Sequence, residues 1–501
     1  MDFVANILTG FGIALTPTNL LFCLIGTFLG SVIGVLPGIG PMTGVALLLP
    51  MTFGMDPTTA IIMMAGIYYG AQYGGSTTSI LVKVPGEISS VVSMLDGYPM
   101  AQQGRAGAAL VTSAVGSFIA GTLSTIGLMV LAMPMANFAL KFGPTEFFSL
   151  MVFGLCMASS FAGESILKSV ISALLGLAMS TVGIDLQSGL PRYTFHIPEF
   201  LNGIEFLTVA LGIFAVAEVL LRASEPPEEV ERVRIQSLKG KLWMTREEWK
   251  RSAGAWVRGT FLGFIIGLFP GMAAALASFV SYDIERKISK TPEKFGKGMI
   301  EGVAGPESAN NSAVGGGMIP LMTLGLPVSG TTAVMLGAFI MFGLQPGPML
   351  FQKNPDFVWG VIASMYIGNV MLLVQNLPFV GLFVRILDLP HSILFPIVQA
   401  FCVLGIYSMT GGVFDLYLMT VFGVIGYFML KNDFPGVPMI LALVLGKELE
   451  QSFRQSLTLS NGDFSIFFSQ PISLGLLILS CGSIFLTALG VKKKILTGIA
   501  G

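Results

Sequence analysis

Charged residues are scarce in this chain of 501 residues, since Asp, Glu, Lys and Arg together make up only 11% of it. Soluble domains carry roughly 25% charged residues. Hydrophobic residues make up 53% of the chain, and its mean hydropathy is +0.80. The apolar runs are continuous and do not alternate with polar residues, which excludes a transmembrane β-barrel. The composition therefore predicts an all-α polytopic membrane protein.

Cysteine and histidine are also rare. The four cysteines stand singly in apolar runs, so no disulfide framework is predicted. The two histidines, His196 and His391, lie near prolines at segment ends and offer neither a metal cluster nor an acid–base pair. The chain has no P-loop motif, which excludes a P-loop ATPase. We predict no enzymatic activity and no cofactor, because even a serine hydrolase built on Ser329 would lack a base with an evident route to it.

Basic residues are concentrated in a few places. Residues 222–256 form the one long polar stretch, and three lysines, Lys492 to Lys494, follow the last apolar run. The positive-inside rule places both in the cytoplasm. The first residues carry no Lys or Arg, so the first apolar stretch is predicted to be a permanent membrane segment and not a cleaved signal. The predicted parts are a first transmembrane repeat (1–221), a cytoplasmic linker (222–256) and a second repeat with C-terminal spans (257–501).

Two polar runs interrupt the apolar sequence. The first, Tyr69 to Glu87, contains glycines, a Pro-Gly pair and four consecutive hydroxyl residues, Ser76 to Ser79, called here the hydroxyl run. The second runs from Glu307 to Gly317 and is followed by Gly325 to Thr332. Irregular backbone at membrane depth is tolerated where it lines a water-filled cavity, and paired interruptions point to a transporter binding site. The alternative is that small residues only let helices pack closely.

An internal repeat accompanies these runs. The segment Phe28 to Gly38 matches Phe261 to Gly271 at seven of eleven positions, and Pro85 to Ser90 stands opposite Pro327 to Thr332 in the same order. This order predicts two repeated, inverted halves with re-entrant hairpins and broken helices. Basic residues flank both ends of the segment 257–282, which a hairpin bent at Pro270 would explain.

The polar runs supply the candidate site residues. Hydroxyl and amide groups at the start of half-helices favour a carboxylate, because amide donors and the positive end of the helix dipole both point at it. The predicted substrate-binding residues are Gly74, Gly75, Ser76, Thr77, Thr78, Ser79, Ser308, Asn310, Asn311, Thr331 and Thr332. The predicted cation-binding residues are Gly38, Gly40, Gly315 and Gly316, through unwound carbonyls, together with Glu307.

Two of the charged residues in these runs have alternative roles. Glu307 could instead cap a half-helix. Lys83 could pair with an anionic substrate or extend to the membrane interface. Glu87 and Asp96 complete the charges that follow the hydroxyl run, and such intramembrane charges are functional candidates by default.

Several motifs together resemble one known family, the large membrane subunit of the tripartite tricarboxylate transporters. They lie at Gly34 to Pro41, Tyr73 to Leu81, Asp96 to Met100, Thr181 to Asp185, Gly305 to Asn311 and Leu441 to Arg454. The resemblance covers essentially the whole chain; one departure is Glu164, where a small residue is expected.

The resemblance implies a multi-pass protein of the bacterial inner membrane that takes up citrate or related carboxylates by Na⁺ or H⁺ symport. It also implies two partners, a small four-span membrane subunit and a periplasmic solute-binding protein. The alternative function is a passive anion channel, which differs from a transporter in lacking coupling to an ion gradient.

Overall fold

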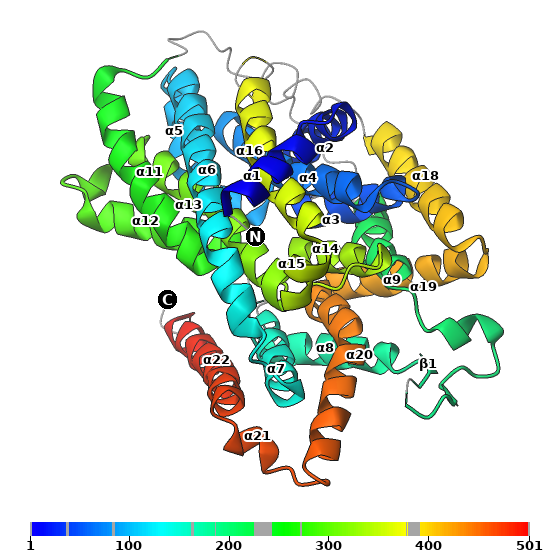
Figure 1. The fold of residues 1–501 in the computed structure, drawn as a ribbon. Coiled ribbons are helices and arrows are strands. Elements are labelled where there is room, and N and C mark those ends of the chain that lie inside the picture. Colours follow the sequence, from blue (N-terminus) through cyan, green and yellow to red (C-terminus); the bar gives the residue numbers. More distant parts are fainter. Residues whose placement is uncertain are drawn as a thin grey trace.

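The computed structural model describes residues 3–36, 40–82, 86–161, 165–185, 187–224, 243–270, 273–376, 378 and 391–498. Almost all of them are helical (Figure 1). The elements of the first half are α1 (Phe3–Ala14), α2 (Pro17–Val35), α3 (Gly40–Leu48), η1 (Leu49–Thr52), α4 (Pro57–Val82), η2 (Ile88–Ser90), α5 (Val91–Gln102), α6 (Ala106–Ala139), α7 (Pro144–Phe161), α8 (Ile166–Ser180), β1 (Gly183–Ile184), β2 (Pro191–Arg192), η3 (Pro198–Asn202), α9 (Phe206–Ala210), η4 (Leu211–Val216) and α10 (Ala217–Ser224).

The elements of the second half are α11 (Arg246–Gly267), α12 (Ala273–Ile288), η5 (Pro292–Lys294), α13 (Glu301–Leu324), α14 (Gly330–Met341), α15 (Pro348–Lys353), α16 (Pro355–Asn376), α18 (His391–Thr410), α19 (Phe414–Lys431), α20 (Gly436–Leu459), α21 (Ile466–Ser469) and α22 (Pro471–Gly498). The two short strands pair antiparallel, Gly183 opposite Arg192. Figure 1 shows α20 to α22 at the opposite end of the molecule from α5 and α11.

The prediction of an all-α polytopic membrane protein is confirmed. Four of the described helices, α2, α6, α16 and α19, are long and apolar enough to cross a membrane, and shorter apolar helices such as α8 and α14 add to them. Large apolar side chains face outward, for example Leu167 and Phe261, each 70% exposed. A soluble protein would bury such side chains, whereas a bilayer covers them.

Two helix pairs in the centre pack in the same way, α2 against α4 and α11 against α13. Glycines spaced four residues apart on α2 and α11 leave no room for a Cβ, because a Cβ there would lie 2.1–2.4 Å from a carbonyl oxygen of the facing helix. The glycines Gly26, Gly30 and Gly34 face Met63, Ile67 and Ala71, and Gly259, Gly263 and Gly267 face Gly305, Ala309 and Ala313. Such glycine stripes allow the backbones of membrane helices to approach closely. The two segments matched in the sequence, 28–38 and 261–271, thus also make matching glycine contacts with their facing helices.

The predicted hairpin near Pro270 is present, because α11 and α12 pack against each other and are joined by a short connection. The division of the chain at residue 256 stays a prediction. The α11 helix begins at Arg246, where Thr245 and Glu248 form a capping box that satisfies the first free amides. The first turns of α11 therefore fall within the predicted linker (222–256), and residues 225–242 of the linker lie outside the described residues.

Candidate functional site

The hydroxyl run lies inside an unbroken helix, so the prediction that it marks a helix break is wrong. The α4 helix continues to Val82. Thr77 and Thr78 donate to backbone oxygens of their own helix, those of Tyr73 (3.3 Å) and Gly75 (3.0 Å). Ser and Thr hydroxyls can satisfy themselves in this way without breaking a helix. The run therefore contributes side chains, and no freed amides, to any site.

The second polar run is also helical throughout, which corrects the corresponding prediction for Glu307 to Gly317. It lies in the middle of α13, and the helix ends only at Gly325, which has φ +66°. Gly315 and Gly316 supply close packing: a Cβ on them would lie 2.2 Å from Ser124 Oγ and 2.5 Å from the Phe264 carbonyl oxygen. Their carbonyls belong to a continuous helix, so the predicted cation site made of unwound carbonyls is wrong at these two positions.

Glu307 is a deeply buried carboxylate in the middle of α13, with 1% of its surface exposed. Three serine hydroxyls surround it from three other helices. Ser76 on α4 lies 2.6 Å and Ser113 on α6 lies 3.0 Å from its Oε2, and Ser93 on α5 hydrogen-bonds to its Oε1. Among the described residues no Lys, Arg or His lies within 4 Å of it. A buried carboxylate held only by hydroxyls is costly unless it binds a cation or a proton.

Glu87 is a second carboxylate in the same region and is only half-buried. Asn310 Nδ2 donates to its Oε1 over 3.2 Å, and Ser89 also hydrogen-bonds to that oxygen. Gly75 makes the approach possible, because a Cβ there would lie 3.0 Å from Glu87 Cγ. Asn310, which binds Glu87, lies one helical turn from Glu307 on α13, so the two carboxylates are close neighbours of the same helix segment.

The contacts of Glu87 have a counterpart in the other half. Glu87 caps η2 with φ −149° and ψ 168°, and Ser329 caps α14 with φ −150° and ψ 168°; each forms a capping box with the residue three positions later. Asn310 of α13 binds Glu87, while Tyr68 of α4 lies 3.4 Å from Ser329 Oγ. Each half therefore reaches across to the cap of the other.

This crossed arrangement is what a two-fold axis produces, because contact i to j then implies contact j to i. Tyr68 and Asn310 are equivalent positions in the two halves. Each directly follows the residue whose carbonyl faces a glycine of the repeat: Ile67 faces Gly30, and Ala309 faces Gly263. The two crossed contacts agree with a local two-fold relation between the caps. Inversion of the complete halves stays a prediction.

Three neighbouring polar atoms on α13 have no partner among the described residues although they are buried. They are Ser308 Oγ, Asn310 Oδ1 and Asn311 Oδ1. Asn311 uses its amide nitrogen to bind Ser117 Oγ at 2.7 Å, which leaves its oxygen free to accept. Buried acceptors without partners are expensive, so oxygens in this position are available for a cation or for a ligand's donor.

The other predicted site residues divide by location. Thr331 and Thr332 lie in the first turn of α14, so the predicted placement at a helix start is correct for them. Gly74 is a packing position, because a Cβ there would lie 2.2 Å from the Ser31 carbonyl oxygen. Gly40 begins α3 with φ +51°, and Gly38 lies outside the described residues. Substrate or cation binding by any of these residues stays a prediction.

Sequence reasoning missed three groups of the site: Ser93 and Ser113, which bind Glu307, and Tyr68, which contacts Ser329. Each comes from a different helix and is far from its partner in the chain, so no local pattern marks it. Glu87 was visible as an intramembrane charge, but its contact with Asn310 spans 223 positions. Only the capping pattern shared by Glu87 to Ser90 and Ser329 to Thr332 gave a signal.

Buried carboxylates and amides inside a polytopic helical bundle define a membrane transport protein. The family model described as "Tripartite tricarboxylate transporter TctA family" matches residues 20–441. The chain therefore belongs to the TctA family, the membrane subunits of tripartite tricarboxylate transporters.

Two relatives from Agrobacterium vitis agree with this assignment. One, described as "Uncharacterized 52.8 kDa protein in TAR-I ttuC' 3'region", is 45% identical over 496 residues, which is 99% of this chain and 98% of that protein. The other, described as "Uncharacterized protein in TAR-II ttuC' 3'region", is 43% identical over 233 residues, 46% of this chain and 96% of that protein. No solved structure matches the chain.

Proposed function

We propose that this chain is the membrane subunit of a binding-protein-dependent secondary transporter that takes up citrate or related carboxylates by Na⁺ or H⁺ symport. The observation that carries the proposal is Glu307, a fully buried carboxylate surrounded by hydroxyls and without a cationic partner among the described residues. Intramembrane carboxylates in this situation mark ion and proton pathways. Family membership supports the substrate class.

The two crossed caps suggest how the cation and the substrate are separated. A carboxylate, Glu87, occupies the cap of η2, so an anionic substrate is repelled there and a cation is attracted. The equivalent cap of α14, a 12-residue helix, carries a neutral residue, Ser329, which binds the Thr332 amide. Among the described residues, the amides of Gly330 and Thr331 have no hydrogen-bond partner. Anions bind well at such a helix start. The substrate carboxylate is therefore assigned to Ser329, Thr331 and Thr332.

The cation is assigned to Glu307 and Glu87 together with the free oxygens of Asn310 and Asn311. Hydroxyls of the run, above all Ser76, complete this side of the site, and Ser308 offers a further acceptor. Carboxylate, amide and hydroxyl oxygens are ligands that suit Na⁺, and a carboxylate pair also suits a proton. Bound cation charge between the two carboxylates would favour the arrival of an anion at the neighbouring cap.

The same proposal includes the location and the partners. The chain is assigned to the bacterial inner membrane, with its linker and C-terminus in the cytoplasm, and it works with a small four-span subunit and a periplasmic solute-binding protein. These assignments rest on the family and on the basic residues of the linker and C-terminal segment.

Uptake of a panel of labelled di- and tricarboxylates into vesicles that hold the complete complex tests the function. We expect accumulation against the substrate gradient, lost when the Na⁺ or H⁺ gradient is collapsed. Entry that only equilibrates the substrate, regardless of the ion gradient, would show a passive anion channel instead.

A topology prediction follows from α9, η4 and α10, which run consecutively over Phe206–Ser224. Nineteen helical residues span about 28 Å, close to the thickness of a bilayer core. The loop before them and the linker after them therefore lie on opposite faces. In a chain without its native cysteines, a cysteine at exposed Leu190 should react with an impermeant maleimide on intact spheroplasts, and one at exposed Glu247 only after permeabilisation. The reverse pattern would contradict the orientation.

A further inference from the structure

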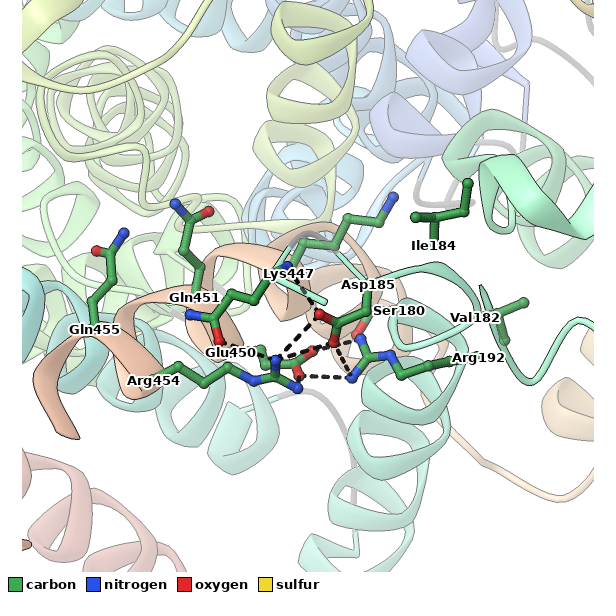
Figure 2. Close-up of a pocket in the computed structure, with 11 residues that line it drawn as sticks. Ser180, Val182, Ile184, Asp185, Arg192, Lys447, Glu450, Gln451, Arg454 and Gln455 are labelled. Carbon is green, nitrogen blue, oxygen red and sulfur yellow. Dashed lines mark hydrogen bonds and ion pairs between the residues drawn. The ribbon is translucent and has the colours of Figure 1, made fainter. Parts of the chain in front are cut away.

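The structure contains a hollow of about 140 Å³. It lies between the end of α8, the loop that carries β1 and β2, and the polar end of α20 (Figure 2). The loop leads into α9 on the side opposite the linker, so the hollow faces the side from which substrate is taken up in the proposed orientation.

One wall of the hollow is an ion-pair network of two carboxylates and two guanidinium groups. Arg192 binds Asp185 at 3.1 Å and Glu450 at 2.8 Å, and Arg454 binds Asp185 at 3.0 Å and Glu450 at 2.5 Å. The backbone N–H of Ser188 also donates to Asp185 and is the main cause that lowers its pKa to about 2. Both carboxylates are thus ionised and matched by the arginines at neutral pH, and the network ties the loop to α20.

Beside the network, α20 carries three further donor side chains that line the hollow. Lys447, Gln451 and Gln455 line the hollow at positions i, i+4 and i+8 of α20, which places them on one face of the helix. Figure 2 shows the two amides pointing to the same side of α20, away from the network. Within the described part of the chain, none of the three makes a hydrogen bond or ion pair. The five charged residues that line the hollow sum to one positive charge, that of Lys447, and Glu205, outside the lining, also interacts electrostatically with Lys447.

These three donors are connected to the substrate side of the proposed central site through α20 itself. Val437, near the start of α20, packs beside the first residue of α14, since a Cβ on Gly330 would lie 2.9 Å from Val437 Cγ2. Lys447 follows ten residues later, about 15 Å along the helix. An anion at the hollow is therefore one helix segment away from the start of α14.

We infer that Lys447, Gln451 and Gln455 form a binding site for a carboxylate anion, which holds the substrate at the mouth of the transporter before it moves to α14. The site rests on the proposed function, because it assumes that a carboxylate is the transported species. An ammonium group gives the charge, and two neutral amides give directed N–H donors that accept either carboxylate oxygen. The matched arginines keep Asp185 and Glu450 from repelling the anion.

Replacing Lys447 by Gln tests this assignment with the complete complex in vesicles and labelled citrate as the probe. We expect the half-saturating citrate concentration to rise about fivefold at low ionic strength, because one exposed charge is lost from the site. The maximal rate should stay the same, since the central site is unchanged. The difference from wild type should shrink at high salt. Gln451→Leu should raise the half-saturating concentration further when combined with Lys447→Gln.

The matched control is Lys141→Gln, which removes another exposed lysine at the far end of α6 and should leave the kinetics unchanged. Equal kinetics for the two lysine variants would overturn the site, even though uptake by the wild type would still support the transport function. No uptake by the wild type would instead count against the proposed function.

The ligand of Lys447, Gln451 and Gln455 could be free substrate or an acidic side chain of a partner protein. Calorimetry of citrate binding to the purified chain alone distinguishes the two. A Lys447→Gln effect on this binding supports the site. An effect that appears only when the solute-binding protein is added would overturn it.

Discussion

Replacing Glu307 by Gln is expected to reduce cation-driven uptake to background while the protein still folds and inserts. Glutamine keeps the shape of the side chain and can still accept from Ser76 and Ser113, so packing around it is conserved. It cannot hold a proton or balance a cation. Because the charge that balances the cation is lost, we expect uptake to fall by at least about a hundredfold, which corresponds to about 2.8 kcal/mol. Initial rates at matched expression, with melting temperatures of the purified proteins, measure both parts of the expectation.

Two further variants give this result its meaning. Glu307→Asp keeps the charge, so it should retain part of the uptake with a changed dependence on the cation concentration. Glu293→Gln removes an exposed carboxylate from the short helix η5 and should behave like the wild type. Normal, gradient-dependent uptake in Glu307→Gln would reduce Glu307 to a packing residue and remove the main support for the proposed cation site.

The fold class could be predicted because it depends on sums over the sequence. Few charges and long apolar runs leave only a helical membrane protein. The repeat could also be seen, because glycines such as Gly30 and Gly263 meet a facing backbone so closely that no other residue fits. A steric requirement of this kind keeps glycine at equivalent positions in both halves, so the repeat is visible in the sequence.

The positions of the helix breaks could not be predicted, because the composition of a segment does not determine which partners its polar groups bind. Thr77 and Thr78 use carbonyls of their own helix, so the hydroxyl run needs no break. Positive φ angles lie instead at Gly40, where α3 begins, and at Gly325, directly after the end of α13 at Leu324. Contacts such as Asn310 with Glu87 depend on the packing of whole helices, and no local pattern in the sequence gives that packing.

Replacing Ser329 by Asp should strongly weaken substrate binding without weakening the α14 helix. Asp is as good an N-cap as Ser, so the Thr332 amide that Ser329 now caps remains satisfied. The substitution recreates at this cap the negative charge that Glu87 provides at the other one. Two like charges about 5 Å apart repel by roughly 3 kcal/mol at an effective dielectric constant of 20. We therefore expect the half-saturating carboxylate concentration to rise about ten- to a hundredfold.

The matched control is Thr245→Asp, which adds the same charge to the other Ser/Thr capping box, that of α11 at the edge of the linker. It should change the half-saturating concentration by less than about twofold, because solvent and salt screen an exposed charge beyond roughly 10 Å. Ser329→Asn keeps the cap without adding charge and should stay close to the wild type. If Ser329→Asp and Thr245→Asp had equal effects, or if Ser329→Asn were as defective as Ser329→Asp, charge at the α14 cap would not govern binding. The substrate carboxylate would then have to be placed away from Thr331 and Thr332, and the crossed caps would serve only to hold the two halves together.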